Sequence, residues 1–500
     1  MNPLVSHGAP TLSPNGMYLT HADGTPFFWL ADTWWYGATV RTPWNAFTKL
    51  VCDRKRKGFT VIQLVVGYPP EVSLGDPSSR NEGGFPTHKD GSINPLYFEA
   101  VDKKIKYLVE NGIVPCIVGG WGHHMTLLGE QTVKALWTEI IKRYGSYPVI
   151  WCLTGEVDLL PPIDLSLETH TIQKMLFHEL KSLLRFSPAR FLFGLWKKIK
   201  QSNPTIPSFW QVRHSRTRPE SGISDHDSGQ ARVTHSALFH KEQPQVETSP
   251  QCRQWARVAR YIKTVSPNRL LTVHVNSRQS ASHLFHNPSW LDIDSIQSGH
   301  TKENAGFLIS SAKTYSASRP FINLEPWYEG IHGDFGPDLE RFAFWASVLS
   351  GAKGHTYGAH GIWNMATNSD PFLSHWGVSD WQGAMHFKGG EQIGKGKQWL
   401  MQFPWWRLLP DSTLLKTPSP THSPYEPLCA RIDKQYILVY MPVGRICHSY
   451  TLLGLSKNRT YTLSYISPKT LRTKKQVSFS NCVTYTIHTP TPKDWLVLIH

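Results

Sequence analysis

Apolar residues in the first 360 positions gather into short runs, most of which end in glycine, proline or an acidic residue. Eight of these runs have the length and the β-branched or aromatic content of buried strands. They are residues 26–32, 60–67, 113–120, 148–156, 269–276, 292–299, 320–326 and 354–360. The pattern therefore predicts eight buried strands in this part of the chain.

Amphipathic helical patterns separate most of the predicted strands. Clear examples are residues 95–112, 131–145 and 253–267, each of which closes on glycine or proline, as helix ends commonly do. Strands that alternate with helices usually form a parallel sheet, so the predicted fold class is α/β. A (β/α)8 TIM barrel is the leading architecture, and a doubly wound open sheet is the alternative.

The pattern changes near residue 410 to short alternating strands without helices. Candidate strands lie within residues 429–442, 459–467, 476–488 and 494–500. This predicts a small all-β sandwich domain over residues 411–500, after a catalytic barrel over residues 1–410.

The connection between the fourth and fifth predicted strands, at about residues 157–252, is unusually long. Its part 202–236 is rich in proline, serine and arginine and has no periodicity. It could be a lid, a disordered insertion or a partner-binding loop.

Polar residues at the ends of the predicted strands are the candidates for chemistry, because in a barrel the loops after the strands surround one mouth. These residues are Asp32, His123, His124, Glu156, His274, Asn276, Gln297, His300 and Glu325.

Two of these strand-end residues, Glu156 after the fourth strand and Glu325 after the seventh, would face each other across the mouth of a barrel. Hydrolysis of a glycosidic bond needs one carboxylic acid to protonate the leaving oxygen and a second carboxylate at the sugar carbon. Carboxyl groups roughly 5 Å apart give retention of configuration, and wider spacing gives inversion. We predict Glu325 as the nucleophile and Glu156 as the acid/base.

The chain has 20 tryptophans, whose flat rings can stack on the C–H faces of sugars. Those near strand ends are candidate sugar contacts, together with Tyr328. The tryptophans are Trp34, Trp35, Trp121, Trp327, Trp363, Trp376 and Trp381.

Several segments together resemble the apiosidase-like glycoside hydrolases, in which a barrel is followed by a small β-rich domain named after collagen binding. The resemblance covers about residues 15–155 and 253–500, and it departs at residues 157–252. It implies a retaining hydrolase with Glu156 as acid/base, Glu325 as nucleophile, and Asp32, Gln297 and His300 lining the pocket. The segments are "DGTPFFWLADTWW", "DRKRKGFTVIQ", "PVIWCLTGE", "LLTVHV", "DSIQSGH" and "RPFINLEPWYEGI".

Composition adds a formal charge of +15, which could attract nucleic acid or an anionic polysaccharide. No nucleic-acid-binding signature accompanies the charge, so nucleic acid is an unlikely partner and an oligosaccharide or polysaccharide substrate is expected. No apolar run approaches the roughly 18 residues that span a membrane, and no signal-peptide pattern is visible, so we expect a cytoplasmic protein without a membrane partner.

The sequence predicts no metal site and no cofactor. It has no HExxH motif, and adjacent histidines such as His123 and His124 would point to opposite sides of a strand. Residues 389–396, "GGEQIGKG", almost match a phosphate-binding loop but lack its final serine or threonine. The seven cysteines form no CxxC pair and are expected to be buried thiols.

The sequence therefore predicts a glycoside hydrolase, and two alternatives from other classes remain. One is a non-catalytic carbohydrate-binding protein with a decayed barrel site. The other is a basic scaffold that binds nucleic acid through the insertion and the C-terminal part. The intact pair Glu156 and Glu325 argues against the first alternative, and the scarcity of dense Lys/Arg runs argues against the second.

Overall fold

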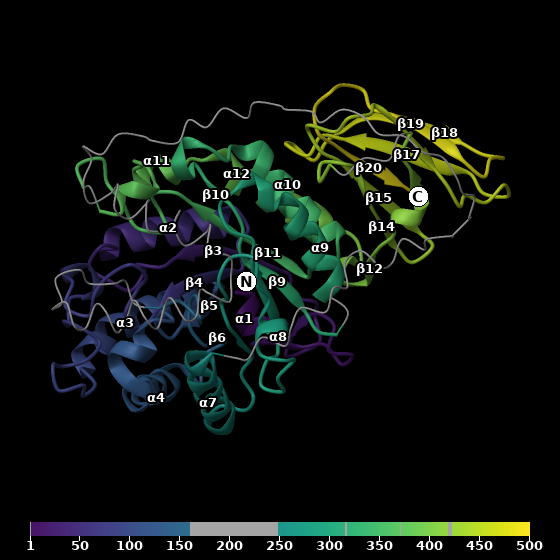
Figure 1. Ribbon diagram of the computed structural model, residues 1–500. Coiled ribbons are helices and arrows are strands. Elements are labelled where there is room, and N and C mark those ends of the chain that lie inside the picture. The colour runs from purple at the N-terminus through teal and green to yellow at the C-terminus, as the bar shows by residue number, and fades with distance from the viewer. Residues whose placement is uncertain (1, 161–248, 316–317, 371, 419–422) are drawn as a thin grey trace, which may run out of the picture. The chain divides into compact units, whose positions relative to one another are not determined.

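The computed structural model in Figure 1 describes residues 2–160, 249–315, 318–370, 372–418 and 423–500. Most of the predicted insertion, residues 161–248, lies outside the described residues.

A seven-stranded parallel sheet forms the centre of the first part of the chain, with strand order β10-β11-β3-β4-β5-β6-β7. Every residue in these strands is buried, as is typical of a parallel sheet that is covered on both faces. The strands are β3 (Trp29–Trp34), β4 (Val61–Val65), β5 (Val114–Val118), β6 (Ile150–Cys152), β7 (Leu271–Thr272), β10 (Tyr328–Glu329) and β11 (Gly354–Ala359).

Strands β8 (Asp294–Gln297) and β9 (Phe321–Glu325) form a separate parallel pair. Backbone hydrogen bonds tie this pair to the larger sheet on both sides, from Asp292 N to Leu271 O at 2.9 Å and from Lys353 N to Phe321 O at 3.0 Å. Among the parallel strands, the last in the chain, β11, pairs with the first, β3. All eight predicted strands are confirmed, and their sequential order is consistent with the predicted barrel rather than with a doubly wound sheet, whose order reverses.

Helices connect most of these strands, and several of them, including α3 and α7, begin with a side-chain cap that the sequence supplies. Asn94 accepts a hydrogen bond from Leu96 N before α3, and Ser249 accepts one from Cys252 N before α7. In both helices a proline takes the first helical position, where no backbone N–H is needed.

The described α-helices are α1 (Pro3–Ser6), α2 (Trp44–Arg56), α3 (Pro95–Glu110), α4 (His124–Tyr144), α7 (Pro250–Val265), α8 (Ala281–Leu284), α9 (Ala305–Tyr315), α10 (Pro337–Leu349), α11 (Trp381–Ala384) and α12 (Lys388–Leu400). The 3-10 turns are η1 (Pro77–Ser79), η2 (Lys302–Asn304), η3 (Ile331–Gly333), η4 (Ser374–Trp376), η5 (Trp405–Arg407) and η6 (Ser412–Leu414).

Two antiparallel sheets follow the parallel strands and are drawn in olive and yellow in Figure 1. One has strand order β12-β14-β15-β20-β17-β18 and the other has order β13-β16-β19. Buried residues of both sheets, such as Val439, Leu463 and Ile487, belong to one apolar core. The strands are β12 (Leu408–Pro410), β13 (Leu415–Lys416), β14 (Leu428–Ile432), β15 (Tyr436–Met441), β16 (Ser449–Leu452), β17 (Tyr461–Ile466), β18 (Thr473–Phe479), β19 (Tyr485–His488) and β20 (Trp495–Ile499).

A short antiparallel pair near the N-terminus, β1 (Pro10–Leu12) with β2 (Leu19–His21), was not predicted. The cysteines also differ in part from expectation. Cys116, Cys152, Cys252 and Cys429 are buried, but Cys52 is exposed, and Cys447 and Cys482 are half-buried.

Candidate active site

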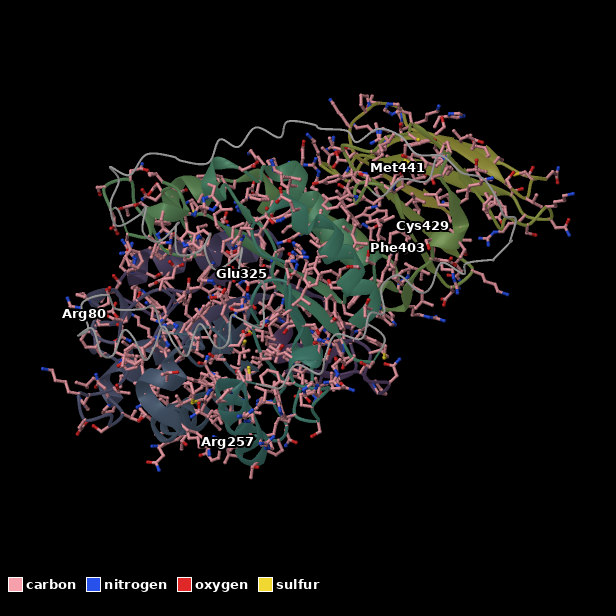
Figure 2. The ribbon with its side chains drawn as sticks, in the orientation of Figure 1. Arg80, Arg257, Glu325, Phe403, Cys429 and Met441 are labelled. Atoms are coloured by element: carbon pink, nitrogen blue, oxygen red, sulfur yellow. The ribbon has the colours of Figure 1, made fainter. Side chains whose placement is uncertain are left out.

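Glu325 is the last residue of β9 and lies inside the parallel-strand region, where Figure 2 labels it. Only 6% of the residue is exposed. His300 Nε2 lies 2.9 Å from Glu325 Oε1, and His274 Nε2 lies 2.9 Å from Glu325 Oε2, although the second contact is poorly aligned for a hydrogen bond. Burial raises the pKa of Glu325, but the two imidazoles outweigh it and hold that pKa well below its usual range.

Glu156 follows β6 in the loop after the strand, with a φ of 40° that side chains rarely adopt. Its carboxylate accepts hydrogen bonds from Trp121 Nε1 at 3.0 Å and Gln297 Nε2 at 3.3 Å. Burial and then the negative charge of Glu325 raise the pKa of Glu156. The two carboxylic acids thus have pKa values shifted in opposite directions.

His274, two residues beyond β7, contacts both glutamate residues. Its Nε2 contacts Glu325, and its Nδ1 accepts a 3.4 Å hydrogen bond from the backbone N–H of Glu156. Burial lowers the pKa of His274, but Glu325 outweighs this effect and raises it. Because one imidazole ring reaches both residues, Glu156 and Glu325 belong to a single site.

Aromatic rings surround this pair of carboxylates on two sides. Trp35 lies 5.1 Å from Trp121 and 5.4 Å from His274 between ring centroids. On the other side Tyr328 lies 4.4 Å from His300, and Trp363 and Trp376 continue the row of rings. The structure therefore brings together these predicted residues: Glu156, Glu325, His274, Gln297, His300, Trp35, Trp121, Tyr328, Trp363 and Trp376.

Asp32 and Trp34 are not among the residues gathered at this site, contrary to the prediction. Asp32 is fully buried and receives hydrogen bonds at 2.6 Å from Arg54 Nε and from Trp34 Nε1. Strand β3 continues to Trp34, so Asp32 lies within the strand rather than at its end. Side chains alternate along a strand, which sends Asp32 and Trp34 towards α2 and leaves the next residue, Trp35, for the site.

Trp327 is also placed elsewhere. Trp327 is fully buried between Phe335 and Phe342, and its indole N–H donates to Thr301 O at 2.8 Å, so it packs the core. His123 is 2% exposed, and burial lowers its pKa to about 4.

The expectation that His123 and His124 point to opposite sides was wrong. Their ring centroids lie 4.1 Å apart. The reason is that α4 begins at His124, well before the predicted start at residue 131, and is interrupted at Gly129, where φ is 75°. At the start of a helix, neighbouring side chains do not alternate as they do in a strand.

Among the described residues, no group of three or more His, Cys, Asp or Glu side chains is arranged so that it could hold a metal ion. Residues 389–396 lie inside helix α12, so they do not form a phosphate-binding loop. No described helix is both long and apolar enough to cross a membrane.

A family model described as "Apiosidase-like, catalytic domain" matches residues 13–407, which is most of the chain. The chain belongs to the apiosidase-like family. This apiosidase-like protein is therefore a glycoside hydrolase, as predicted. The match ends at residue 407, next to the first strand of the C-terminal sheets at Leu408.

Solved glycoside hydrolases share the fold of the apiosidase-like protein. One, described only as a glycoside hydrolase, is 18% identical with a TM-score of 0.70, and the match covers 100% of this chain and 98% of the other. A family 5 glycoside hydrolase from Bacteroides vulgatus ATCC 8482 is also 18% identical, with a TM-score of 0.71 and coverage of 100% and 95%. No curated protein matches the chain.

The sequence did not single out Asp158 as a residue that supports the apiosidase-like site. Its carboxylate accepts hydrogen bonds from Asn276 Nδ2 at 2.6 Å and Gln279 Nε2 at 3.0 Å. These bonds tie the loop that carries Glu156 to the loop after β7. The signal was available, because Asp158 follows Glu156 by two positions in "TGEVD".

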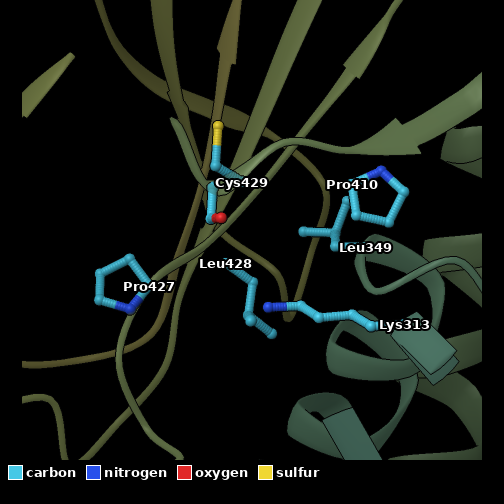
Figure 3. Close-up of a pocket in the computed structure, with 7 residues that line it drawn as sticks. Lys313, Leu349, Pro410, Pro427, Leu428 and Cys429 are labelled. Carbon is cyan, nitrogen blue, oxygen red and sulfur yellow. The ribbon is translucent and has the colours of Figure 1, made fainter. Parts of the chain in front are cut away.

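A cavity of about 350 Å³ lies elsewhere in the apiosidase-like protein, where α9 and α10 meet the C-terminal strands (Figure 3). Its walls include Lys313, Leu349, Leu428 and Cys429. Burial, followed by the charge of Asp411, raises the pKa of the Cys429 thiol to about 12, so this cysteine is not a ready nucleophile. None of the residues around the two carboxylates lines this cavity.

Proposed function

We propose that the protein hydrolyses a glycosidic bond with retention of configuration, with Glu325 as the nucleophile and Glu156 as the acid/base. Eight of the parallel strands, β3 to β9 and β11, would form a closed (β/α)8 barrel with this site at one mouth, and the C-terminal sheets would form a sandwich. The observation that carries the proposal is the geometry around His274, which contacts the carboxylate of Glu325 through Nε2 and the backbone N–H of Glu156 through Nδ1. Opposite directions of the pKa shifts of the two glutamic acids support it.

In the first step the ionised Glu325 attacks the anomeric carbon while Glu156 donates its proton to the leaving oxygen. The glycosidic C–O bond breaks, and a glycosyl ester forms on Glu325. His274 and His300 keep Glu325 ionised and oriented before this attack, because both rings contact its oxygens.

In the second step Glu156 acts as a base and removes a proton from the water that cleaves the ester. The structure supports this reversal of role. The charge of Glu325 is one cause of the raised pKa of Glu156, and that charge disappears when Glu325 becomes an ester. The pKa of Glu156 then falls, so the same group that donated a proton is ready to accept one.

Unpaired polar atoms around the site suit a sugar substrate. Gln297 Oε1 and His300 Nδ1 are buried and have no hydrogen-bond partner, which is costly unless a ligand supplies one. Sugar hydroxyl groups can donate and accept such bonds, and the half-buried ring of Trp376 can stack on a sugar C–H face. Plant and microbial oligosaccharides are the proposed substrates, and the family name puts apiosides first in a screen.

Retention is tested by ¹H NMR during hydrolysis of an aryl glycoside chosen from a panel of pentosides, apiosides and hexosides. We expect the first sugar product to have the same anomeric configuration as the substrate, before mutarotation mixes the two anomers. A first product of the opposite configuration would show that water attacks directly and that Glu325 is not a nucleophile.

We expect a bell-shaped dependence of kcat/KM on pH. Glu325 must be ionised, and its lowered pKa places the acidic limb below the usual range of a glutamic acid. Glu156 must be protonated, and its raised pKa lets activity persist above that range before the basic limb begins. Initial rates between about pH 3 and 10 measure both limbs. A basic limb that survives in Glu156→Ala, assayed with an activated aryl glycoside, would contradict its assignment to Glu156.

A further inference from the structure

Glu71, in the connection between β4 and α3, contacts two residues of the connection that follows β11. Its Oε1 accepts a 2.7 Å hydrogen bond from the indole N–H of Trp376, and its Oε2 lies 2.9 Å from His375 Nε2. One carboxylate thus holds two adjacent side chains of a distant segment. The backbone of Glu71 has a φ of 59°, a conformation that costs free energy in a residue with a side chain.

Trp376 is only half-buried, and His300 lies between it and the proposed nucleophile. Its ring centroid is 5.9 Å from that of His300, which contacts Glu325, and 6.5 Å from that of Trp363. Because Glu71 occupies the indole N–H, Trp376 has no hydrogen bond to offer a ligand. What remains for a ligand is the flat face of the ring, which suits a sugar C–H face.

Other contacts fix the backbone of the segment that carries Trp376. Arg41 donates a 2.6 Å hydrogen bond to Asp370 and a 3.1 Å bond to Asn364 O. His360 Nε2 lies 3.0 Å from Gly377 O, and Ser379 Oγ donates to His360 O at 2.9 Å. Since these anchors flank Trp376 and do not involve Glu71, the carboxylate orients the indole ring rather than the segment.

We propose that Glu71 is a positioning residue that holds Trp376 as a sugar-stacking platform beside His300, which contacts Glu325. The proposal rests on the proposed glycosidase function and adds a residue that determines substrate affinity. A hydrogen bond from an N–H to an ionised carboxylate is stronger than one to a neutral acceptor, so a carboxylate is well suited to hold one orientation of the indole.

The first test is the kinetics of Glu71→Ala with the 4-nitrophenyl glycoside that the wild-type enzyme cleaves best. We expect KM to rise about threefold to tenfold, the range that loss of one ordered aromatic contact gives, and kcat to change less than about twofold. Glu71→Gln keeps an oxygen that accepts the indole N–H, and it should restore most of the affinity. The matched control is Glu99→Ala, which removes an exposed carboxylate from α3 and should leave KM unchanged.

A double-mutant comparison tests whether Glu71 acts through Trp376. If it does, adding Glu71→Ala to Trp376→Ala should raise KM no further. Additive losses, a fall in kcat at constant KM, or a Glu71→Gln variant as impaired as Glu71→Ala would each overturn the proposal.

A spectroscopic measurement separates this proposal from the proposed function. In protein labelled with 5-fluorotryptophan, the ¹⁹F resonance that is missing from Trp376→Phe belongs to Trp376. We expect this resonance to move or broaden in Glu71→Ala and to stay in place in Glu71→Gln and in Glu99→Ala. An unchanged resonance in Glu71→Ala would refute the positioning role, whether or not the wild-type enzyme hydrolyses a glycoside. If the protein proved not to be a glycosidase, the expected ¹⁹F shift in Glu71→Ala would be unaffected, so the two proposals can fail separately.

Discussion

Glu325→Gln is expected to abolish turnover of every glycoside, with kcat reduced by more than about 10⁴-fold. The amide that replaces the carboxylate is not a nucleophile, so no glycosyl-enzyme can form. A better leaving group cannot compensate, because it assists only the departure and does not replace the attacking atom. Initial rates with both a natural oligosaccharide and an activated aryl glycoside measure the loss.

The control for Glu325→Gln must show that the site is intact. Gln has nearly the shape of Glu, so the variant should unfold cooperatively and should still bind the hydrolysis product, which can be followed by tryptophan fluorescence. Retained turnover on the activated glycoside, within about 10²-fold of wild type, would assign the nucleophile to another residue.

Much of this site could be predicted from where strands end. Glu325 was found because a buried apolar run ends on it, and β9 does end at Glu325. Glu156 was found in the same way, although β6 itself ends at Cys152 and the carboxylate lies in the following loop. His274, Gln297 and His300 follow the same rule, since parallel strands bring their carboxyl ends together.

The residues that were misplaced show the limits of that rule. A one-residue difference in register decides whether a side chain faces the site or the surrounding helices, and it separates Trp35 from Trp34. His123 was expected at the end of a strand, but the early start of α4 replaced alternation with helical spacing. Local patterns do not fix where a strand stops and a helix starts to within one residue.

Contacts between two connections were beyond prediction from the sequence. Glu71 and Trp376 are separated by 305 positions, and neither belongs to a periodic pattern. Their hydrogen bond depends on the conformation of two irregular segments, including the left-handed backbone at Glu71. The predicted fold gave no means of placing them side by side.

The family match and the geometry of the site are independent evidence that the protein is a glycoside hydrolase. The match covers residues 13–407 and establishes glycoside hydrolase membership. The geometry adds a difference that a family name does not contain, because the surroundings raise the pKa of Glu156 and lower that of Glu325. These opposite shifts support the proposed roles, because an acid must hold a proton and a nucleophile must not.

Glu156→Ala is expected to behave differently from Glu325→Gln. With a poor leaving group kcat/KM should fall by a factor on the order of 10² to 10⁴, since the departing oxygen loses its proton donor. With an activated aryl glycoside the loss should be much smaller, because that oxygen leaves without protonation. The glycosyl-enzyme should then accumulate, since no base activates the water for the second step. A burst of aryl alcohol followed by slow release measures this accumulation.

Azide should rescue that slow second step in Glu156→Ala. A small anion needs no base to attack the glycosyl ester, and removal of the Glu156 carboxylate leaves space for it and removes a charge that would repel it. Two displacements at the same carbon restore the original configuration, so the product should be a glycosyl azide of retained anomeric form. The wild-type enzyme is the control and should form no such azide. Equal losses on both substrates, without an azide product, would show that Glu156 is neither the acid nor the base. The Glu156 carboxylate, which accepts hydrogen bonds from Gln297 and Trp121, would then have a different role.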